Sequence, residues 1–119
     1  MKTAVFRSPA LRLSVFRSGD GSVTWEGTYN GMAIKFAMPV DGDCVIMLDP
    51  DASKERVFRN LLRVECNGRQ RWLAELPADP DTFLDVQREG EALMARTWSG
   101  FRMRVDAASG KTRSQEFTK

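Results

Sequence analysis

Histidine is absent from the 119-residue chain. Its absence excludes Ser-His-Asp and Cys-His nucleophile systems, histidine-ligated zinc, and the usual general base near neutral pH. The chain also lacks the phosphate-binding, dinucleotide-binding and nucleophile-elbow motifs GxxxxGK[ST], GxGxxG and GxSxG. We therefore expect no catalytic residues and no cofactor, although a histidine-free hydrolase built on two converging carboxylates stays open as a third hypothesis.

Cysteine is scarce as well, with Cys44 and Cys66 far apart and in no metal-ligand spacing. We expect two reduced thiols, Cys44 in a buried strand and Cys66 in an exposed loop, and no metal site. Long apolar runs are missing, and Arg7 and Arg12 interrupt the segment where a signal peptide would have its apolar core. These features predict a cytoplasmic protein without a membrane segment.

The charges are nearly balanced, giving a net charge of +2. Thirteen of the 18 cationic residues are arginine, a side chain whose fork suits carboxylates, phosphates and aromatic rings. A cationic N-terminal stretch and a second one around Arg56–Arg71 stand out, but Glu65 interrupts the latter and Glu75 follows it. Nucleic acid is thus a possible partner that the pattern does not favour.

Alternation of apolar and polar residues dominates the chain, and glycine-containing turns such as "YNG", "VDGD", "CNGR" and "WSGF" recur between the runs. This pattern predicts one all-β domain, residues 1–119, an antiparallel meander of about eight to ten strands. In "GMAIKFAM" the alternation places Met32, Ile34, Phe36 and Met38 on one face, whereas "CVIMLD" is apolar from Cys44 to Leu48 and indicates a strand covered on both faces. A small barrel and a two-layer sandwich both fit. The segment 49–60 has room for a single helical turn capped by Ser53.

The hairpin at 60–76 allows two registers. A two-residue Asn67-Gly68 turn would mix arginines into the apolar face, whereas a three-residue loop with left-handed Gly68 pairs Glu65 with Arg69. The second register separates the apolar side chains from the charged ones, so we prefer it. It places an apolar set on one face and a solvated charged set on the other: Leu62, Val64, Trp72, Ala74 and Leu76 against Arg63, Glu65, Arg69 and Arg71.

The hairpin at 91–111, "EALMARTWSGFRMRVDAASGK", contains one arginine that does not fit. A two-residue Ser99-Gly100 turn pairs Trp98 with Phe101 and Arg96 with Met103, which sets Arg96 on the apolar face. Three accounts are open: a rim position with the head in water, a pair with Glu75 or Asp85 or a stack on Trp98, or a pocket for an anionic ligand. Since departures from pattern often mark function, Arg96 is the first candidate binding residue.

Aromatic residues supply the other candidates. Trp25 and Tyr29 lie where a strand meets glycine-rich turns, and Trp98 lies beside its own turn. Such residues usually plug the end of a sandwich or barrel, and exposed ones anchor protein partners. The candidate binding residues are therefore Arg96, Trp98, Trp25 and Tyr29.

Two segments, "LLRVECNGRQRW" (61–72) and the region 91–112, are similar to each other, each with an arginine-valine-acid strand that enters a glycine-basic turn. Both resemble blade hairpins of quinoprotein-like β-propellers. The matching positions are Val64, Glu65, Gly68, Arg69 and Trp72 in the first copy and Val105, Asp106, Gly110 and Lys111 in the second. The second copy lacks the closing tryptophan, and the chain is too short for the roughly four blades of a propeller. The resemblance implies blade-like hairpins without quinone chemistry.

The leading hypothesis from the sequence is a non-enzymatic cytoplasmic protein-interaction module, with a protein partner or a second copy of itself as a homodimer. The alternative is a β-barrel that binds a small ligand or nucleic acid.

Overall fold

The computed structural model describes residues 2–21 and 23–118. They form twelve strands and one short 3-10 turn, η1 (Pro50–Ala52). The strands are β1 (Lys2–Arg7), β2 (Leu11–Arg17), β3 (Val23–Tyr29), β4 (Met32–Val40), β5 (Asp43–Leu48), β6 (Val57–Phe58), β7 (Leu61–Val64), β8 (Gln70–Leu73), β9 (Asp81–Glu89), β10 (Ala92–Thr97), β11 (Phe101–Asp106) and β12 (Thr112–Phe117). The predicted all-β class is confirmed.

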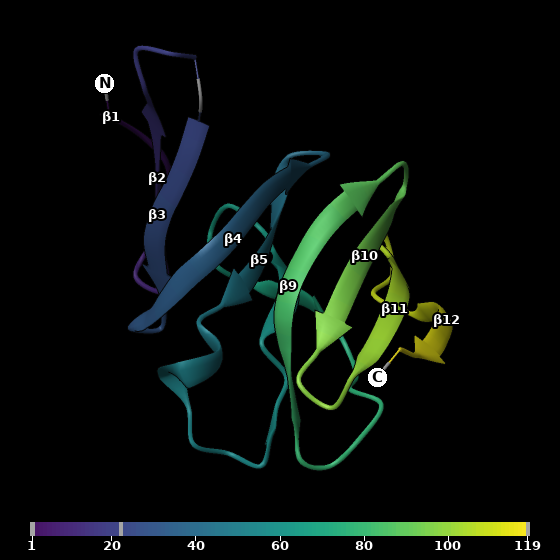
Figure 1. Cartoon of the computed structure of the whole chain (residues 1–119). Coiled ribbons are helices and arrows are strands. Elements are labelled where there is room, and N and C mark those ends of the chain that lie inside the picture. The colour runs from purple at the N-terminus through teal and green to yellow at the C-terminus, as the bar shows by residue number, and fades with distance from the viewer. Residues whose placement is uncertain (1, 22, 119) are drawn as a thin grey trace.

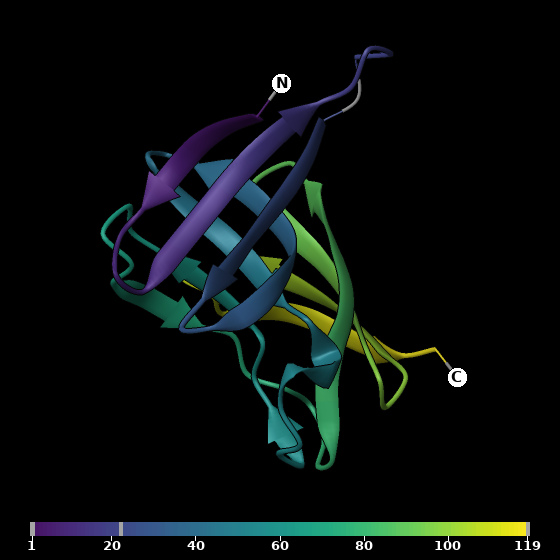
Figure 2. The ribbon, with the colours of Figure 1, turned by 90° about the vertical axis from the view of Figure 1, so that its left-hand side faces the viewer.

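The strands make two sheets (Figure 1). A seven-stranded sheet has the order β1-β2-β3-β4-β5-β7-β8, and a five-stranded sheet has the order β12-β11-β10-β9-β6. The first sheet curls like half a barrel, so that β1–β3 cross in front of the strands that follow them (Figure 2). Neighbours are antiparallel except for two-residue β6, which pairs with β9 in parallel.

Strand β5 is the centre of the packing, because all six of its residues are buried. Val45 and Met47 face the five-stranded sheet, in a group that we call the intersheet cluster, with Leu61, Trp72, Phe83, Leu93, Met103 and Val105 among its members. Ile46 and Leu48 face the other way, in the curl cluster, which includes Leu11, Leu13, Tyr29, Cys44, Leu62 and Val64. The predicted strand with two covered faces is confirmed.

Strand β4 changes faces at Lys35. Ile34 pairs with Leu48 and Phe36 with Met47, so Lys35 is an extra residue, a β-bulge. Ile34 therefore joins the curl cluster, whereas Phe36 and Met38 pack with the intersheet cluster. The expectation of a single apolar face from Met32 to Met38 was wrong because one inserted residue reverses the alternation.

Asn60 joins the two sheets at a fully buried position. Its side-chain amide donates to the carbonyls of Leu48 (2.8 Å) and Phe83 (2.9 Å), and its oxygen accepts from the Phe83 N–H (2.8 Å). Both donors and the acceptor are thus satisfied without water, as burial requires.

The short turn η1 begins differently from the prediction. Asp49 is its N-cap, with a carboxylate that accepts from the Asp51 N–H at 2.9 Å. Ser53 follows the turn as its C-cap, so the predicted capping role of Ser53 was wrong.

The β7–β8 hairpin confirms the predicted turn but not the predicted faces. Gly68 has φ +90°, and the Glu65 N–H donates to Arg69 O at 2.8 Å. A register shift between Arg63 and Val64 then pairs Arg63 with Trp72. Arg63 and Trp72 are consequently buried on the intersheet side, while Leu62 and Val64 face the curl cluster. The prediction that Arg63 belongs to a solvated ladder was wrong.

Candidate interaction surface

The β10–β11 hairpin has a wider turn than predicted. Arg96 pairs with Arg102 and Ala95 with Met103, one residue away from the predicted register. The turn is closed by the Thr97 hydroxyl, which accepts from the Phe101 N–H at 3.2 Å. Because the register differs by one, the side chains of β10 exchange faces while those of β11 keep theirs, and Arg96 lies on the outer, exposed face. The placement of Arg96 on the apolar face was wrong.

Asp81 holds this turn in place. Its buried carboxylate accepts from the Ser99 N–H (2.9 Å) and from the Ser99 hydroxyl (2.6 Å). The sequence "DPD" at 79–81 is typical of a turn and gave no sign of this contact 18 residues away. The anchoring of Ser99 explains why a two-residue Ser99-Gly100 turn does not form.

A row of charges crosses the outer face of the five-stranded sheet. The register sets Asp85, Arg96, Arg102 and Glu116 side by side on β9, β10, β11 and β12. Arg96 donates from Nε to Asp85 Oδ2 at 2.8 Å and forms a second contact to the same oxygen from Nη2. This hydrogen bond and the charge of Asp85 raise the pKa of Arg96. Of the three explanations open for Arg96, the structure shows the ion pair with Asp85.

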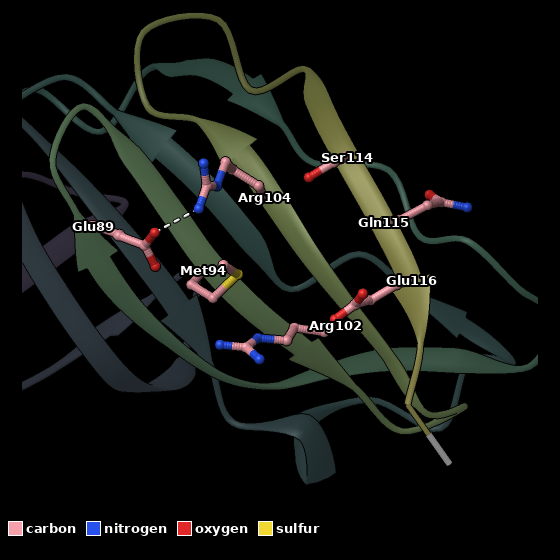
Figure 3. A pocket seen from close by; sticks show the side chains of 7 residues that line it. All are labelled: Glu89, Met94, Arg102, Arg104, Ser114, Gln115 and Glu116. Carbon is pink, nitrogen blue, oxygen red and sulfur yellow. Dashed lines mark hydrogen bonds and ion pairs between the residues drawn. The ribbon is translucent and has the colours of Figure 1, made fainter.

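The outer face contains two adjoining shallow hollows, and Met94 and Arg102 line both. The first, of about 350 Å³, also includes Glu89, Arg104 and residues 114–116 of β12 (Figure 3). The second, of about 370 Å³, contains the Arg96–Asp85 pair. Arg104 pairs with Glu89, but within the described part of the chain no ion pair holds Arg102. Arg102 is therefore the cation on this face that is available to a partner.

Strand β12 borders this face as the edge of its sheet. All six residues, Thr112–Phe117, are exposed, and in the described residues β11 is the one strand that pairs with it. An edge strand presents a row of backbone N–H and C=O groups that another strand can bind. Phe117, 61% exposed, stacks its ring obliquely on Phe101 at 5.4 Å between centroids. The edge thus combines main-chain hydrogen-bonding groups with an exposed aromatic ring.

The predicted site residues fall into two separate groups. Arg96 and Trp98 belong to the β10–β11 hairpin, and Trp98 is 56% exposed, so the core interpretation was wrong for it. Trp25 and Tyr29 belong to β3 in the other sheet. Tyr29 is buried in the curl cluster and donates its hydroxyl proton to Gly68 O at 3.3 Å, and Trp25 is half-buried against that cluster. The structure does not bring the four residues together.

A buried ion pair escaped the sequence interpretation. Arg63 donates to Asp43 Oδ2 (2.9 Å) and to the carbonyls of Ala107 (3.1 Å) and Val40 (3.4 Å), and Arg71 also approaches Asp43 at 3.4 Å. The consecutive apolar residues in "NLLRV" were the available signal, because a strand covered on both faces buries its arginine in either register. Asp43 and Arg63 therefore stabilise the junction of three segments.

The thiols match the expectation from sequence, since both are unpaired, with Cys44 buried and Cys66 exposed. The described residues contain no group of three or more acidic, cysteine or histidine side chains that could hold a metal ion. Residues 2–21 and 23–118 include no helix long and apolar enough to span a bilayer.

Comparison with known proteins assigns the chain to a family. Residues 19–117 match the family described as "Domain of unknown function (DUF7957)". The chain belongs to this family. No curated protein matches it. Among solved structures it is similar to the crystal structure of BamB from Moraxella catarrhalis, at 17% identity and a TM-score of 0.49, over 99% of this chain and 39% of that chain. This DUF7957 chain therefore spans well under half the length of that protein. The two segments that resemble propeller blades form hairpins, β7–β8 and β10–β11, and their kinship with such blades stays a prediction.

Proposed function

We propose that this DUF7957 chain is a non-enzymatic protein-interaction module of the cytoplasm that pairs with a second copy of itself through β12. The observation that carries the proposal is the exposure of all six residues of an edge strand. Natural edge strands are usually short, bulged, covered, or protected by proline or inward charges. Strand β12 contains no proline or lysine, its register shift lies near its start at Arg113, and its end bears exposed Phe117.

The backbone of β12 is oriented for strand addition. The Thr118 N–H donates to Gly100 O at 2.9 Å, and the register continues through the pairs Arg102–Glu116 and Arg104–Ser114. Since hydrogen-bonded and non-bonded pairs alternate in an antiparallel ladder, Glu116 and Ser114 direct their N–H groups at β11. The N–H and C=O of Gln115 consequently point away from the sheet, toward an added strand.

The sequence of β12 is compatible with its own antiparallel copy. A register centred on Gln115 sets Glu116 opposite Ser114 and Arg113 opposite Phe117, so that no like charges face each other. A two-fold axis at Gln115 gives a closed, isologous contact. Trp98 lies in the turn that Thr118 contacts, so this end of the interface offers exposed indole and phenyl rings.

Chromatography with light scattering tests the proposal, with Gln115→Pro as the variant. Proline removes the outward N–H of Gln115 and leaves the ladder to β11 intact, whereas Gln115→Thr keeps that N–H and is the matched control. We expect twice the 13.4 kDa chain mass for the wild type and Gln115→Thr, and the single-chain mass for Gln115→Pro. A monomeric wild type at all concentrations, or a dimeric Gln115→Pro protein, would contradict the proposal.

A second candidate function is the binding of an anionic ligand or nucleic acid. The hollow that contains Arg96 and unpaired Arg102 favours it, because guanidinium groups bind phosphate oxygens through paired hydrogen bonds. Excess absorbance at 260 nm across a monomer peak would support this function and would count against pairing through β12.

The cytoplasmic assignment also belongs to the proposal, and the two unpaired thiols, one of them exposed, support a reducing compartment.

A further inference from the structure

Two arginines stand directly opposite each other in the β1–β2 hairpin. The register pairs Arg7 with Arg12, and both side chains are exposed. Like charges in this arrangement destabilise a sheet. The five-stranded sheet contains the same arrangement in Arg96 and Arg102, where Asp85 binds Arg96.

No such carboxylate compensates Arg7 and Arg12 among the described residues. Strand β1 is the sheet edge, so no further strand can supply one on that side, and on the other side Arg12 pairs with Thr28. Glu26 lies in the next row, opposite Ser14, and makes no ion pair with either arginine. The first 17 residues contain four cations and no anionic residue. The charges of Arg7 and Arg12 are therefore unbalanced among the described residues.

The arginines line a hollow of about 230 Å³. Ser14 and Thr28 add hydroxyl groups to its lining, and Phe6 and Phe16 add aromatic rings. Glu26 lines it as well and disfavours anions on its own side. Guanidinium and hydroxyl donors that line one hollow together with aromatic rings suit an oxyanion, and arginine recognises phosphate through charge-assisted, bidentate hydrogen bonds.

We propose that the Arg7–Arg12 pair binds a phosphate group, which supplies the missing negative charge between the two guanidinium groups. This site lies on the seven-stranded sheet and is independent of pairing through β12. A phosphate there relieves the repulsion of the pair. The ligand-free hairpin is accordingly less stable than it would be with one arginine removed.

Thermal unfolding with inorganic phosphate tests this site at constant ionic strength, with sodium chloride as the balancing salt. We expect the Tm of the wild type to rise by about 4 °C at phosphate five times its Kd. Arg12→Thr should melt at or above the wild-type temperature without phosphate and should lose the specific rise. This variant also corrects for the general stabilising effect of phosphate on proteins.

Arg88→Thr is the matched control, because Arg88 is an exposed arginine of β9 that lines neither the hollow beside Arg7 and Arg12 nor the two hollows of the outer face. It should keep the full phosphate response. Adenosine monophosphate shows whether the phosphate group comes from a nucleotide or from free phosphate. If it raises the Tm at a tenfold lower concentration than inorganic phosphate does, the ligand is a nucleotide whose base contacts the phenyl rings. If the two compounds act at equal concentrations, the ligand is free phosphate. A phosphate response that survives in Arg12→Thr, or that disappears in Arg88→Thr, would overturn the proposal.

Discussion

Arg63 shows how one side chain can hold a junction of strands together. It is buried beside Trp72, and its guanidinium satisfies Asp43 and two backbone carbonyls from distant segments. Removal of one partner from a buried pair leaves an uncompensated charge, although here Arg71 stays near Asp43.

We predict that Arg63→Met lowers the free energy of unfolding by about 3 kcal/mol, measured by urea denaturation. Arg69→Met, at an exposed position whose pair with Glu65 is loose, is the control and should cost less than about 0.5 kcal/mol. Equal effects of the two substitutions would show that the Arg63 network contributes little to stability.

Cys44 gives the stability a dependence on alkaline pH. Burial, with a smaller contribution from Asp43, raises the pKa of its thiol from 9.0 to about 11. Between these values the unfolded thiol loses its proton while the folded one keeps it, so the folded state binds more protons and stability falls as the pH rises.

We expect the free energy of unfolding to fall by roughly 2 kcal/mol more in the wild type than in Cys44→Ala between pH 9 and pH 11. The comparison of the two proteins removes the contributions of other titrating groups. Parallel pH profiles would refute the role of Cys44.

At the scale of elements, the β11–β12 turn docks onto the other sheet. Ala107 O accepts from Arg63 and from Trp72 Nε1 (3.0 Å), and a Cβ added at Gly110 would lie 2.4 Å from the indole ring. Gly110 also has φ +76°, a conformation that favours glycine. This turn and the Asn60 hydrogen bonds fasten the two sheets.

Gly110→Ala should therefore destabilise the protein by at least about 3 kcal/mol, since backbone strain and a clash with Trp72 add together. Gly90→Ala is the matched control: Gly90 has φ +63° with open space around its Cβ position, so strain alone should cost about 1 kcal/mol. If urea denaturation midpoints show that Gly110→Ala and Gly90→Ala lower the free energy of unfolding equally, the contact between Gly110 and Trp72 is not tight.

The alternation of apolar and polar residues predicted where the strands lie, but it often assigned their side chains to the wrong face of the sheet. The reason is that single inserted residues shift the register. The alternation was right for β5, where every residue is buried, residues 44–48 are all apolar, and no choice of faces arises. It failed at Lys35, at the shift between Arg63 and Val64, and at the turn after Arg96. Each error reversed the faces of a whole segment, because the side-chain period of a strand is two. The contacts that set these shifts, such as Asp81 to Ser99, join residues far apart in the sequence.

At the scale of the whole molecule, glycine-punctuated alternation was enough to predict an antiparallel all-β fold. The strand order was not accessible, because the curl of the seven-stranded sheet and the parallel β6–β9 pair depend on long-range contacts. The candidate site was predicted in part: Arg96 and Trp98 belong to the β10–β11 hairpin of the sheet that β12 borders, while Trp25 and Tyr29 belong to the other sheet. A single domain over residues 1–119 stays a prediction.

Residue-resolved amide hydrogen exchange, recorded over a range of protein concentrations, tests pairing through β12 most directly. The amides of Gln115 and Phe117 point away from β11, whereas that of Glu116 is bonded to it and provides an internal reference. The account predicts that exchange at Gln115 and Phe117 slows as the concentration rises, while the Glu116 amide is protected throughout. Fast exchange of the two outward amides at every concentration would contradict it.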